Sequence, residues 1–220
     1  YAKIFGINEN LPNLLSMSLG AGETTLLKLT NGYGMIVNGG KKIVPTFIDR
    51  VQDRRGKTII KNDMRNCVLC NSFDSIDETK IPKIRDEREQ VTDPGSAYQM
   101  VSMLRGAVVR GTGRLVNKVN KTLAGKTGTT NDNTDAWFIG FSSDLVVGVF
   151  VGFDKPKSLG HKETGSSVSA PIFRQFMSKA LHNKTDIPFR RPSGIKIIKV
   201  NPKTGLMVSA KAKKYILEAF

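Results

Sequence analysis

Two apolar segments joined by a short polar turn constrain the fold of this chain more than any other feature of its sequence. Residues 137–141 and 145–153 are rich in aromatic residues, valine and glycine, and Ser142, Ser143 and Asp144 separate them. Aromatic and β-branched runs on both sides of such a turn are typical of a β-hairpin. The sequence therefore predicts two antiparallel strands over residues 137–153.

Three glycines of this predicted hairpin, Gly140, Gly148 and Gly152, occupy even-numbered positions. Successive side chains of a strand point to opposite faces of the sheet, and glycine leaves its own face uncovered. We expect one face of the sheet to be locally bare, so that another element can approach it closely.

Three other segments carry apolar residues at helical spacing, namely residues 24–37, 93–111 and 171–181. The second of them begins with Asp93, a typical N-cap residue, followed by Pro94 at the first helical position. Each segment is expected to form a helix with one apolar side.

Two further strand regions complete the pattern. Residues 122–130 precede the main hairpin, and residues 44–60 form two apolar runs around a turn at 53–56, which predicts a smaller hairpin. The order of these elements predicts an α+β fold, with an antiparallel sheet flanked by helices. We expect a main domain over residues 1–182 with a loop excursion at 62–91, followed by a basic C-terminal extension at 183–220.

The composition excludes some classes of protein and of binding partner. The 220 residues are 39% hydrophobic and 24% charged, which is typical of a globular protein, and no apolar run of 18 residues is present to span a membrane. The net charge of +15 attracts anions of many kinds, among them nucleic acids, lipid headgroups and carboxylates. The basic stretches lack the interleaved aromatic residues that stack on bases, so nucleic acid is not an expected partner.

A metal site is not expected either. Cys67 and Cys70 form one C-x-x-C pair, and His161 and His182 lie far along the chain at a spacing that does not suit zinc. A loop disulfide or two inert thiols fits the cysteine pair better. The two histidines are expected at the surface or in loops.

The most informative short motif is Gly125-Lys126-Thr127-Gly128-Thr129-Thr130. A phosphate-binding loop would need a glycine where Asn120 stands and a helix directly after the lysine. An ordinary strand of small residues with one charge is a second interpretation. The third is the K-T-G element of serine acyl-transferring enzymes that react with penicillin, in which an edge strand presents a lysine, hydroxyls and a glycine to the substrate.

The context of this motif favours the third interpretation. In chain order, the sequence resembles the class A high-molecular-mass penicillin-binding proteins from residue 1 to about residue 181. The resemblance rests on the segments 20–27, 33–40, 65–70, 110–113, 125–130, 135–141, 151–154 and 170–173. It implies a penicilloyl serine transferase fold that is incomplete at its N-terminal side, as expected for the C-terminal part of a transpeptidase domain.

The resemblance also implies a reaction. A serine attacks the carbonyl of a D-Ala-D-Ala stem peptide, D-Ala leaves, and an amine of a neighbouring stem resolves the acyl-enzyme; penicillin mimics the donor peptide and stays attached. By family position, Lys126 would assist proton transfer and bind the substrate carboxylate. Thr127 and Thr129 would hold that carboxylate, Gly128 would leave room for the substrate backbone, and the Thr129 N–H would serve the oxyanion hole. No cofactor is implied for this reaction.

The implied partners are peptidoglycan stem peptides, β-lactams, the preceding part of the same domain and a glycosyltransferase domain in the parent protein. The implied location is the bacterial cell envelope, on the outer, periplasmic side of the cytoplasmic membrane, with the anchor outside this chain. The first residues look like a cut inside a longer chain. We expect a fragment that is marginally stable on its own, because the sheet face that should cover the missing central helix is exposed.

The sequence departs from the family pattern in two motifs. It contains no S-x-N, and its one S-x-x-K, Ser193 to Lys196, follows the K-T-G element instead of preceding it. We interpret Ser193 as a turn residue, so the nucleophile and its lysine are absent and the chain alone is expected to be inactive. The open alternatives are a binding module for peptidoglycan peptides or β-lactams, a related hydrolase that would need the same serine, and a basic nucleic-acid-binding protein.

Overall fold

The structure is a computed structural model that describes residues 1–63, 65, 86–209 and 211–220. The chain divides into two compact units, one formed by residues 1–42 and 90–220 and the other by residues 43–89. Cys67 and Cys70 lie outside the described residues, so the prediction for them stands untested. None of the described helices is long and apolar enough to cross a membrane.

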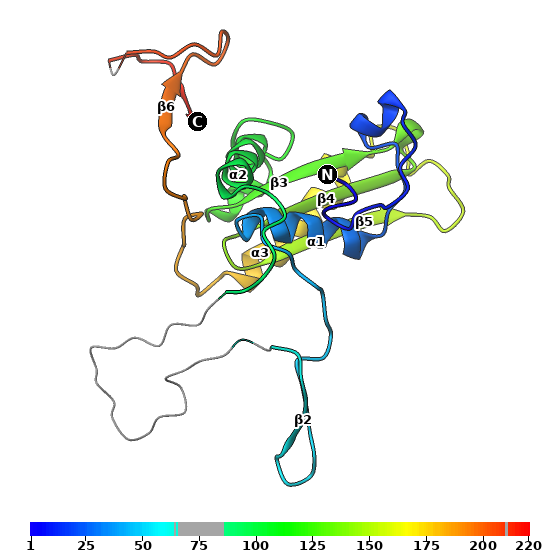
Figure 1. The fold of residues 1–220 in the computed structure, drawn as a ribbon. Coiled ribbons are helices and arrows are strands. Elements are labelled where there is room, and N and C mark those ends of the chain that lie inside the picture. Colours follow the sequence, from blue (N-terminus) through cyan, green and yellow to red (C-terminus); the bar gives the residue numbers. More distant parts are fainter. Residues whose placement is uncertain (64, 66–85, 210) are drawn as a thin grey trace, which may run out of the picture. The chain divides into compact units, whose positions relative to one another are not determined.

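A three-stranded antiparallel sheet forms the centre of the larger unit (Figure 1). Its strands are β3 (Ala124–Thr129), β4 (Asp135–Phe141) and β5 (Val146–Gly152), arranged in the order β3-β4-β5. The predicted main hairpin is thus confirmed as β4 and β5. The Ser142 hydroxyl donates to the carboxylate of Asp144 at 2.8 Å and closes the turn between them.

All three predicted helices are present as α1 (Leu26–Val37), α2 (Pro94–Val109) and α3 (Ala170–Ala180). Thr25 caps α1 and Asp93 caps α2, each by accepting a backbone N–H through its side-chain oxygen. Short helical turns cover Leu15–Leu19 (η1), Val116–Val119 (η2), Asn131–Asn133 (η3) and Gly165–Ser169 (η4).

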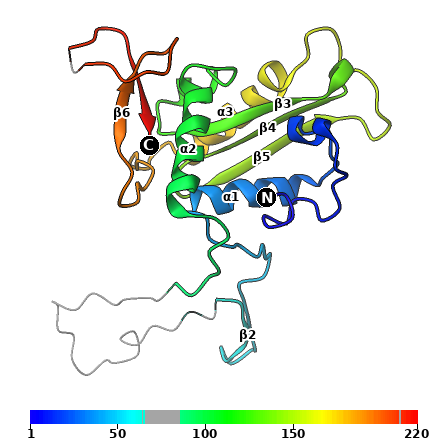
Figure 2. The same cartoon turned by 45° about the horizontal axis from the view of Figure 1, so that its top comes forward.

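The helices cover both faces of the sheet (Figure 2). Phe138 of β4 packs against Phe173 of α3, with ring centroids 4.7 Å apart, while Phe141 of the same strand packs edge-on against Tyr33 of α1. Positions three apart in a strand point to opposite faces, so α3 lies on one side of the sheet and α1 on the other. The α1 face also receives the buried Val101 and Leu104 of α2.

The glycines of the hairpin differ from the prediction. A Cβ at Gly140 would meet the Phe173 ring at 2.7 Å, whereas one at Gly148 would collide with Thr30 and Leu26 of α1. Gly140 pairs with Val147, so Gly148 belongs to the next pair and faces the other side of the sheet. In this hairpin an even-numbered residue of β4 faces the same side as an odd-numbered residue of β5, so even-numbered glycines of the two strands lie on opposite faces. The expectation of one bare face is therefore wrong. Each face has its own close approach.

A second hairpin follows α3 and packs against α2. Its strands are β6 (Ile197–Val200) and β7 (Ile216–Ala219). The Gln99 side chain of α2 donates to the Ala219 carbonyl at 3.4 Å, and Arg110 pairs with Glu218 at 2.6 Å. The basic extension at 183–220 thus contains a folded element that contacts the main part of the larger unit.

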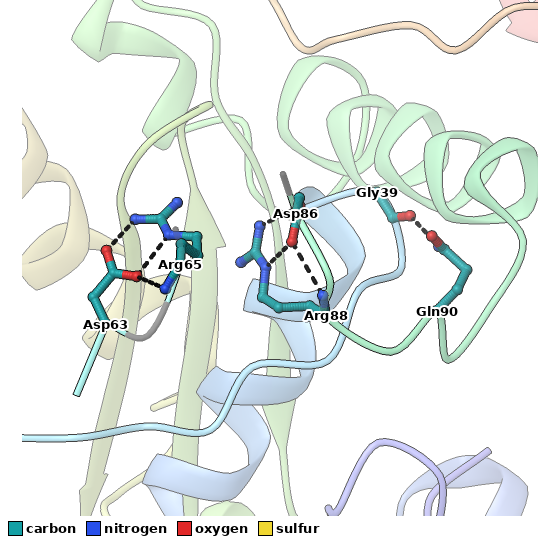
Figure 3. A network of polar contacts seen from close by, with 6 residues as sticks. All are labelled: Gly39, Asp63, Arg65, Asp86, Arg88 and Gln90. Atoms are coloured by element: carbon teal, nitrogen blue, oxygen red, sulfur yellow. Dashed lines mark hydrogen bonds and ion pairs between the residues drawn. The ribbon is translucent and has the colours of Figure 1, made fainter. Parts of the chain in front are cut away.

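The smaller unit contains the predicted small hairpin, β1 (Arg50–Gln52) with β2 (Thr58–Lys61). Beyond it, Asp63 pairs with Arg65 at 2.6 Å (Figure 3). The hydrogen bonds from Arg65 hold the pKa of the Asp63 carboxyl below its usual range. Because the two residues are neighbours and exposed, the pair orders only the local chain.

The chain leaves the larger unit and returns to it at adjacent residues. Lys41 and Gln90 form an isolated β-bridge, and the Gln90 side chain donates to the Gly39 carbonyl at 2.7 Å (Figure 3). Gly40 adopts a left-handed conformation with φ +78°, and a Cβ there would collide with Thr92. Both features require a glycine at this crossing.

Candidate active site

The strand that carries the K-T-G motif lies at an edge of the sheet. β3 pairs with β4 on one side only, and its first two residues, Ala124 and Gly125, are buried while the following ones reach the surface. A Cβ at Gly125 would come within 2.7 Å of the Ile139 carbonyl, so glycine allows the two strands to pair closely here. The buried start of β3 therefore anchors an accessible end.

The register shows which backbone groups of β3 face the free edge. The Thr130 N–H donates to the Asp135 carbonyl at 3.2 Å just beyond the paired residues. Bonded and non-bonded pairs alternate along an antiparallel ladder, so Thr127 and Thr129 belong to non-bonded pairs with Phe138 and Ala136. The N–H and carbonyl groups of both threonines consequently point away from β4.

Side chains of the motif project to both faces of the sheet. Lys126 and Gly128 share a face with their cross-strand partners Ile139 and Trp137, whereas Thr127 and Thr129 lie on the opposite face. The Lys126 ammonium nevertheless donates to the Thr127 carbonyl at 2.9 Å. The ammonium group therefore lies at the free edge of β3.

Each threonine hydroxyl contacts a different supporting segment. The hydroxyl of Thr127 lies 2.8 Å from that of Thr112, in the turn that follows α2. The hydroxyl of Thr129 accepts the Gly165 N–H of η4 at 3.0 Å. The motif is thus held from two sides by segments that are remote in the sequence.

The η4 turn lies directly against the strand. A Cβ at Gly165 would come within 3.2 Å of the Gly128 nitrogen and would collide with the carbonyls of Gly128 and Trp137. The buried Ser169 hydroxyl donates to the Ala136 carbonyl at 2.7 Å and fixes the other end of η4. Sequence analysis missed this support, although the capping pattern of Thr164 and Ser167 is a local signal for a helical turn there.

Two aromatic side chains, Trp137 and Phe150, lie on the same face of the sheet as Lys126, which we call the lysine face. Trp137 is half-buried and packs on Phe150 with ring centroids 4.7 Å apart, and Phe150 is 41% exposed. Phe138, on the other face, is fully buried as a core residue. Of these two neighbouring aromatic residues, only Phe138 is a fully buried core residue.

Ser193 lies away from the motif. It is exposed in a turn where Gly194 has φ +89°, as expected from its neighbours, and Ile195 packs at Gly95 near the start of α2. Thr112, which contacts Thr127, follows the other end of that helix, which spans 16 residues and about 24 Å. The structure thus does not bring Ser193 to Lys126.

The two histidines are exposed in turns, as predicted for surface residues. Across residues 1–63, 65, 86–209 and 211–220, no group of three or more His, Cys, Asp or Glu side chains could hold a metal ion. What the β3 edge offers is an ammonium group, two hydroxyls and two outward N–H groups within a few residues. Such donors suit a carboxylate and a developing oxyanion.

Comparison with known proteins identifies the family. The family model described as "Penicillin binding protein transpeptidase domain" matches residues 5–178. The chain belongs to the penicillin-binding protein transpeptidase family. The predicted family and fold class are thereby confirmed.

Individual members of this family resemble the chain over most of its length. It is 47% identical over 219 residues to penicillin-binding protein 1A of Rickettsia prowazekii, covering 99% of this chain and 27% of that protein. It is 37% identical over 197 residues to penicillin-binding protein 1A of Neisseria gonorrhoeae, covering 89% and 23%. The crystal structure of penicillin-binding protein 1A from Haemophilus influenzae superposes with a TM-score of 0.80 at 27% identity, covering 99% of this chain and 35% of that one. The chain therefore spans about a quarter of the length of the curated relatives it matches.

Proposed function

We propose that this chain forms the carboxylate-binding side of the active site of a peptidoglycan D,D-transpeptidase. The observation that carries the proposal is the edge strand β3, which presents Lys126 and the outward amides of Thr127 and Thr129 beside two hydroxyls. Membership of the penicillin-binding protein transpeptidase family supports the same reaction.

The roles follow from the chemistry of each group. Lys126 attracts the terminal carboxylate of the stem peptide and assists proton transfer at the serine. Thr127 and Thr129 donate their hydroxyl protons to the carboxylate, and Gly128 leaves space for the peptide backbone. The outward Thr129 N–H stabilises the oxyanion of the tetrahedral intermediate. The peptide itself extends along the free edge of β3 as an added strand.

The reaction is acyl transfer through a serine of the preceding part of the domain. The serine oxygen attacks the penultimate D-Ala carbonyl, the terminal D-Ala leaves as an amine, and the amine of a second stem peptide breaks the ester. Penicillin acylates the same serine. The proposal assigns these steps to side chains and amides without a metal or an organic cofactor.

The proposed setting is the outer, periplasmic side of the bacterial cytoplasmic membrane, in a protein that also carries a glycosyltransferase domain. The names of the penicillin-binding protein 1A relatives, and the quarter of their length that this chain spans, support such a parent. Nucleic acid is not a proposed partner.

A second candidate is favoured by the motifs themselves. The 220 residues contain no S-x-N, and their one S-x-x-K lies in the exposed turn at Ser193. A nucleophile needs its base within hydrogen-bonding reach. The chain by itself would then bind stem peptides or β-lactams without turning them over.

The test is the rate of acylation by a fluorescent penicillin in the transpeptidase domain assembled from this chain and the preceding part. Lys126→Ala should lower the second-order rate constant on the order of 100-fold, because a charged partner of the carboxylate is lost. Lys118→Ala is the matched control, since Lys118 is an exposed lysine on η2, shortly before Lys126 in the sequence. Equal losses in both variants would reduce the role of Lys126 to its contribution to the general positive field and would contradict the proposal.

A further inference from the structure

The turn between α2 and η2 provides a hydroxyl that the proposed mechanism does not yet use. Thr112 Oγ1 lies 2.8 Å from Thr127 Oγ1, and both side chains lie at the surface of the larger unit. Among the residues that the structure describes, neither hydroxyl has another hydrogen-bond partner. The two hydroxyls therefore form an isolated pair, and the hydroxyl of the pair that does not donate within it can donate its proton to a ligand.

The backbone of the turn holds Thr112 in place. The N–H groups of Gly111 and Gly113 both donate to the Ala107 carbonyl, at 3.1 Å and 3.0 Å. Cβ atoms at these glycines would come within 2.9 Å and 3.2 Å of the same carbonyl oxygen, so the turn lies tightly on the end of α2. Arg110, just before it, is paired with Glu218 of β7. Thr112 is thus presented by a rigid support.

The direction of the hydrogen bond follows from a count of protons. A hydroxyl carries one proton, so in a pair of hydroxyls one donates and the other accepts. If Thr127 is to donate its proton to a carboxylate, its oxygen has to accept the proton of Thr112. The resulting chain runs from Thr112 through Thr127 to the anion, and each hydrogen bond in such a chain strengthens the next.

We propose that Thr112 is a positioning residue for the substrate carboxylate, because its hydroxyl donates to Thr127 and turns the Thr127 proton toward the anion. The inference rests on the proposed function, since it assumes that Thr127 binds a carboxylate. It predicts that Thr112 affects only ligands that carry this negative charge.

The experiment compares acylation by benzylpenicillin with acylation by its uncharged methyl ester, again in the assembled transpeptidase domain. Thr112→Val keeps the shape of the side chain and removes the hydroxyl. It should lower the rate for the free acid roughly 3- to 10-fold, the effect of one hydrogen bond, and leave the rate for the ester within about twofold. Thr112→Ser should restore the rate for the acid.

A second threonine pair in the same strand region supplies the control. Thr130 Oγ1 lies 2.7 Å from Thr134 Oγ1, so Thr134→Val removes an equivalent hydroxyl partner beside the motif. It should leave the ratio of the acid rate to the ester rate unchanged. When Thr112→Val is combined with Thr127→Val, the acylation rate for the free acid should fall no further than in Thr127→Val alone, because Thr112 acts through Thr127.

The possible outcomes test the role of Thr112 separately from carboxylate binding at β3. Equal losses for acid and ester in Thr112→Val would show a merely structural role of the turn and overturn the inference. An unchanged acid rate in Thr112→Val, with a loss in Thr127→Val, would overturn the inference and leave the proposed function intact. If the unmodified domain does not distinguish acid from ester, carboxylate binding at β3 fails, and the inference fails with it.

Discussion

At the scale of single residues, Thr30 shows how closely α1 lies on the sheet. Its side chain faces Gly148 of β5, and its hydroxyl is buried without a hydrogen-bond partner among the described residues. A buried hydroxyl that makes no hydrogen bond destabilises the folded state, because the hydroxyl has lost its hydrogen bonds to water. Glycine at 148 leaves space for the Thr30 side chain but offers nothing to satisfy its polar atom.

We therefore predict that Thr30→Val stabilises the larger unit. Valine has the same shape and removes the unsatisfied group, so the free energy of unfolding should rise by about 1 kcal/mol. Urea unfolding of the two proteins measures the difference. Thr25→Val is the contrasting control and should destabilise by about 1 kcal/mol, because Thr25 caps α1. A loss of stability in Thr30→Val would show that its hydroxyl is satisfied in solution.

At the scale of elements, η4 packs directly against the K-T-G strand. Gly165 lies against the backbone of Gly128, and its N–H donates to Thr129. We predict that Gly165→Ala pushes β3 away from η4 and lowers penicillin acylation roughly 10-fold, with a loss of about 1–3 kcal/mol in stability. Ser166→Ala, whose side chain contacts Thr164, should change the rate by less than about twofold. Equal acylation rates in Gly165→Ala and the unmodified domain would mean that η4 does not position the strand.

A second tether joins the segment after α3 to the start of β3. The Thr122 N–H and hydroxyl both donate to the carboxylate of Asp186 at 2.7 Å, and these bonds lower the pKa of Asp186 below its usual value. A lowered pKa in the folded state stabilises the protein above the unfolded pKa, near 4, and this contribution is lost as the pH falls through the folded value. The tether should therefore hold at neutral pH and weaken in acid.

We predict that Asp186→Asn lowers stability at pH 7 by less than about 1 kcal/mol, because the site is exposed and solvent screens it. The difference from the unmodified protein should shrink below about pH 4. Urea unfolding between pH 3 and pH 7 measures it, with Asp154→Asn as an exposed control. A difference that is constant across this pH range would show that the Asp186 charge contributes nothing.

The elements differ in how far the sequence predicts them. Asp93 with Pro94 and the turn at Ser142 are local signals, so α2 and the β4–β5 hairpin could be predicted from them. The short strands β6 and β7 could not, because β7 is held by contacts with Gln99 and Arg110, which are more than 100 residues away from it.

The same limit applies to the site. The motif identifies Lys126, Thr127 and Thr129 by their order alone. Their supports, Thr112 and Gly165, are 15 and 36 residues from the threonines they contact, and no periodicity links them. Such contacts follow from the packed fold and not from any local pattern.

At the scale of the whole molecule, apolar surface remains open on this chain. Large apolar side chains of α1, α2 and β5 are exposed, among them Leu27, Met103 and Phe150. Where such side chains lie together, they mark surfaces that bind other protein. We expect the preceding part of the transpeptidase domain to cover the lysine face of the sheet beside α1, where Phe150 packs on Trp137.

This expectation predicts a gain in stability and a change at Trp137, the one tryptophan of the chain. Adding the preceding part should raise the melting temperature in a concentration-dependent way, because it binds only the folded chain. If only this chain is labelled with 5-fluorotryptophan, adding the preceding part should shift the fluorine resonance of Trp137. The fluorine atom should also become less accessible to solvent. A cooperative melt at high temperature for the isolated chain, with no shift on addition, would contradict the account.

In the proposed function, the β3 edge is one side of a serine acyl-transfer site whose nucleophile lies elsewhere. The most direct test is the intact mass after incubation with penicillin, for this chain alone and for this chain with the preceding part of the domain. We expect no adduct on the chain alone and one penicilloyl group per assembled domain, attached to the preceding part. A stoichiometric adduct on the chain alone, abolished by Ser193→Ala, would contradict it.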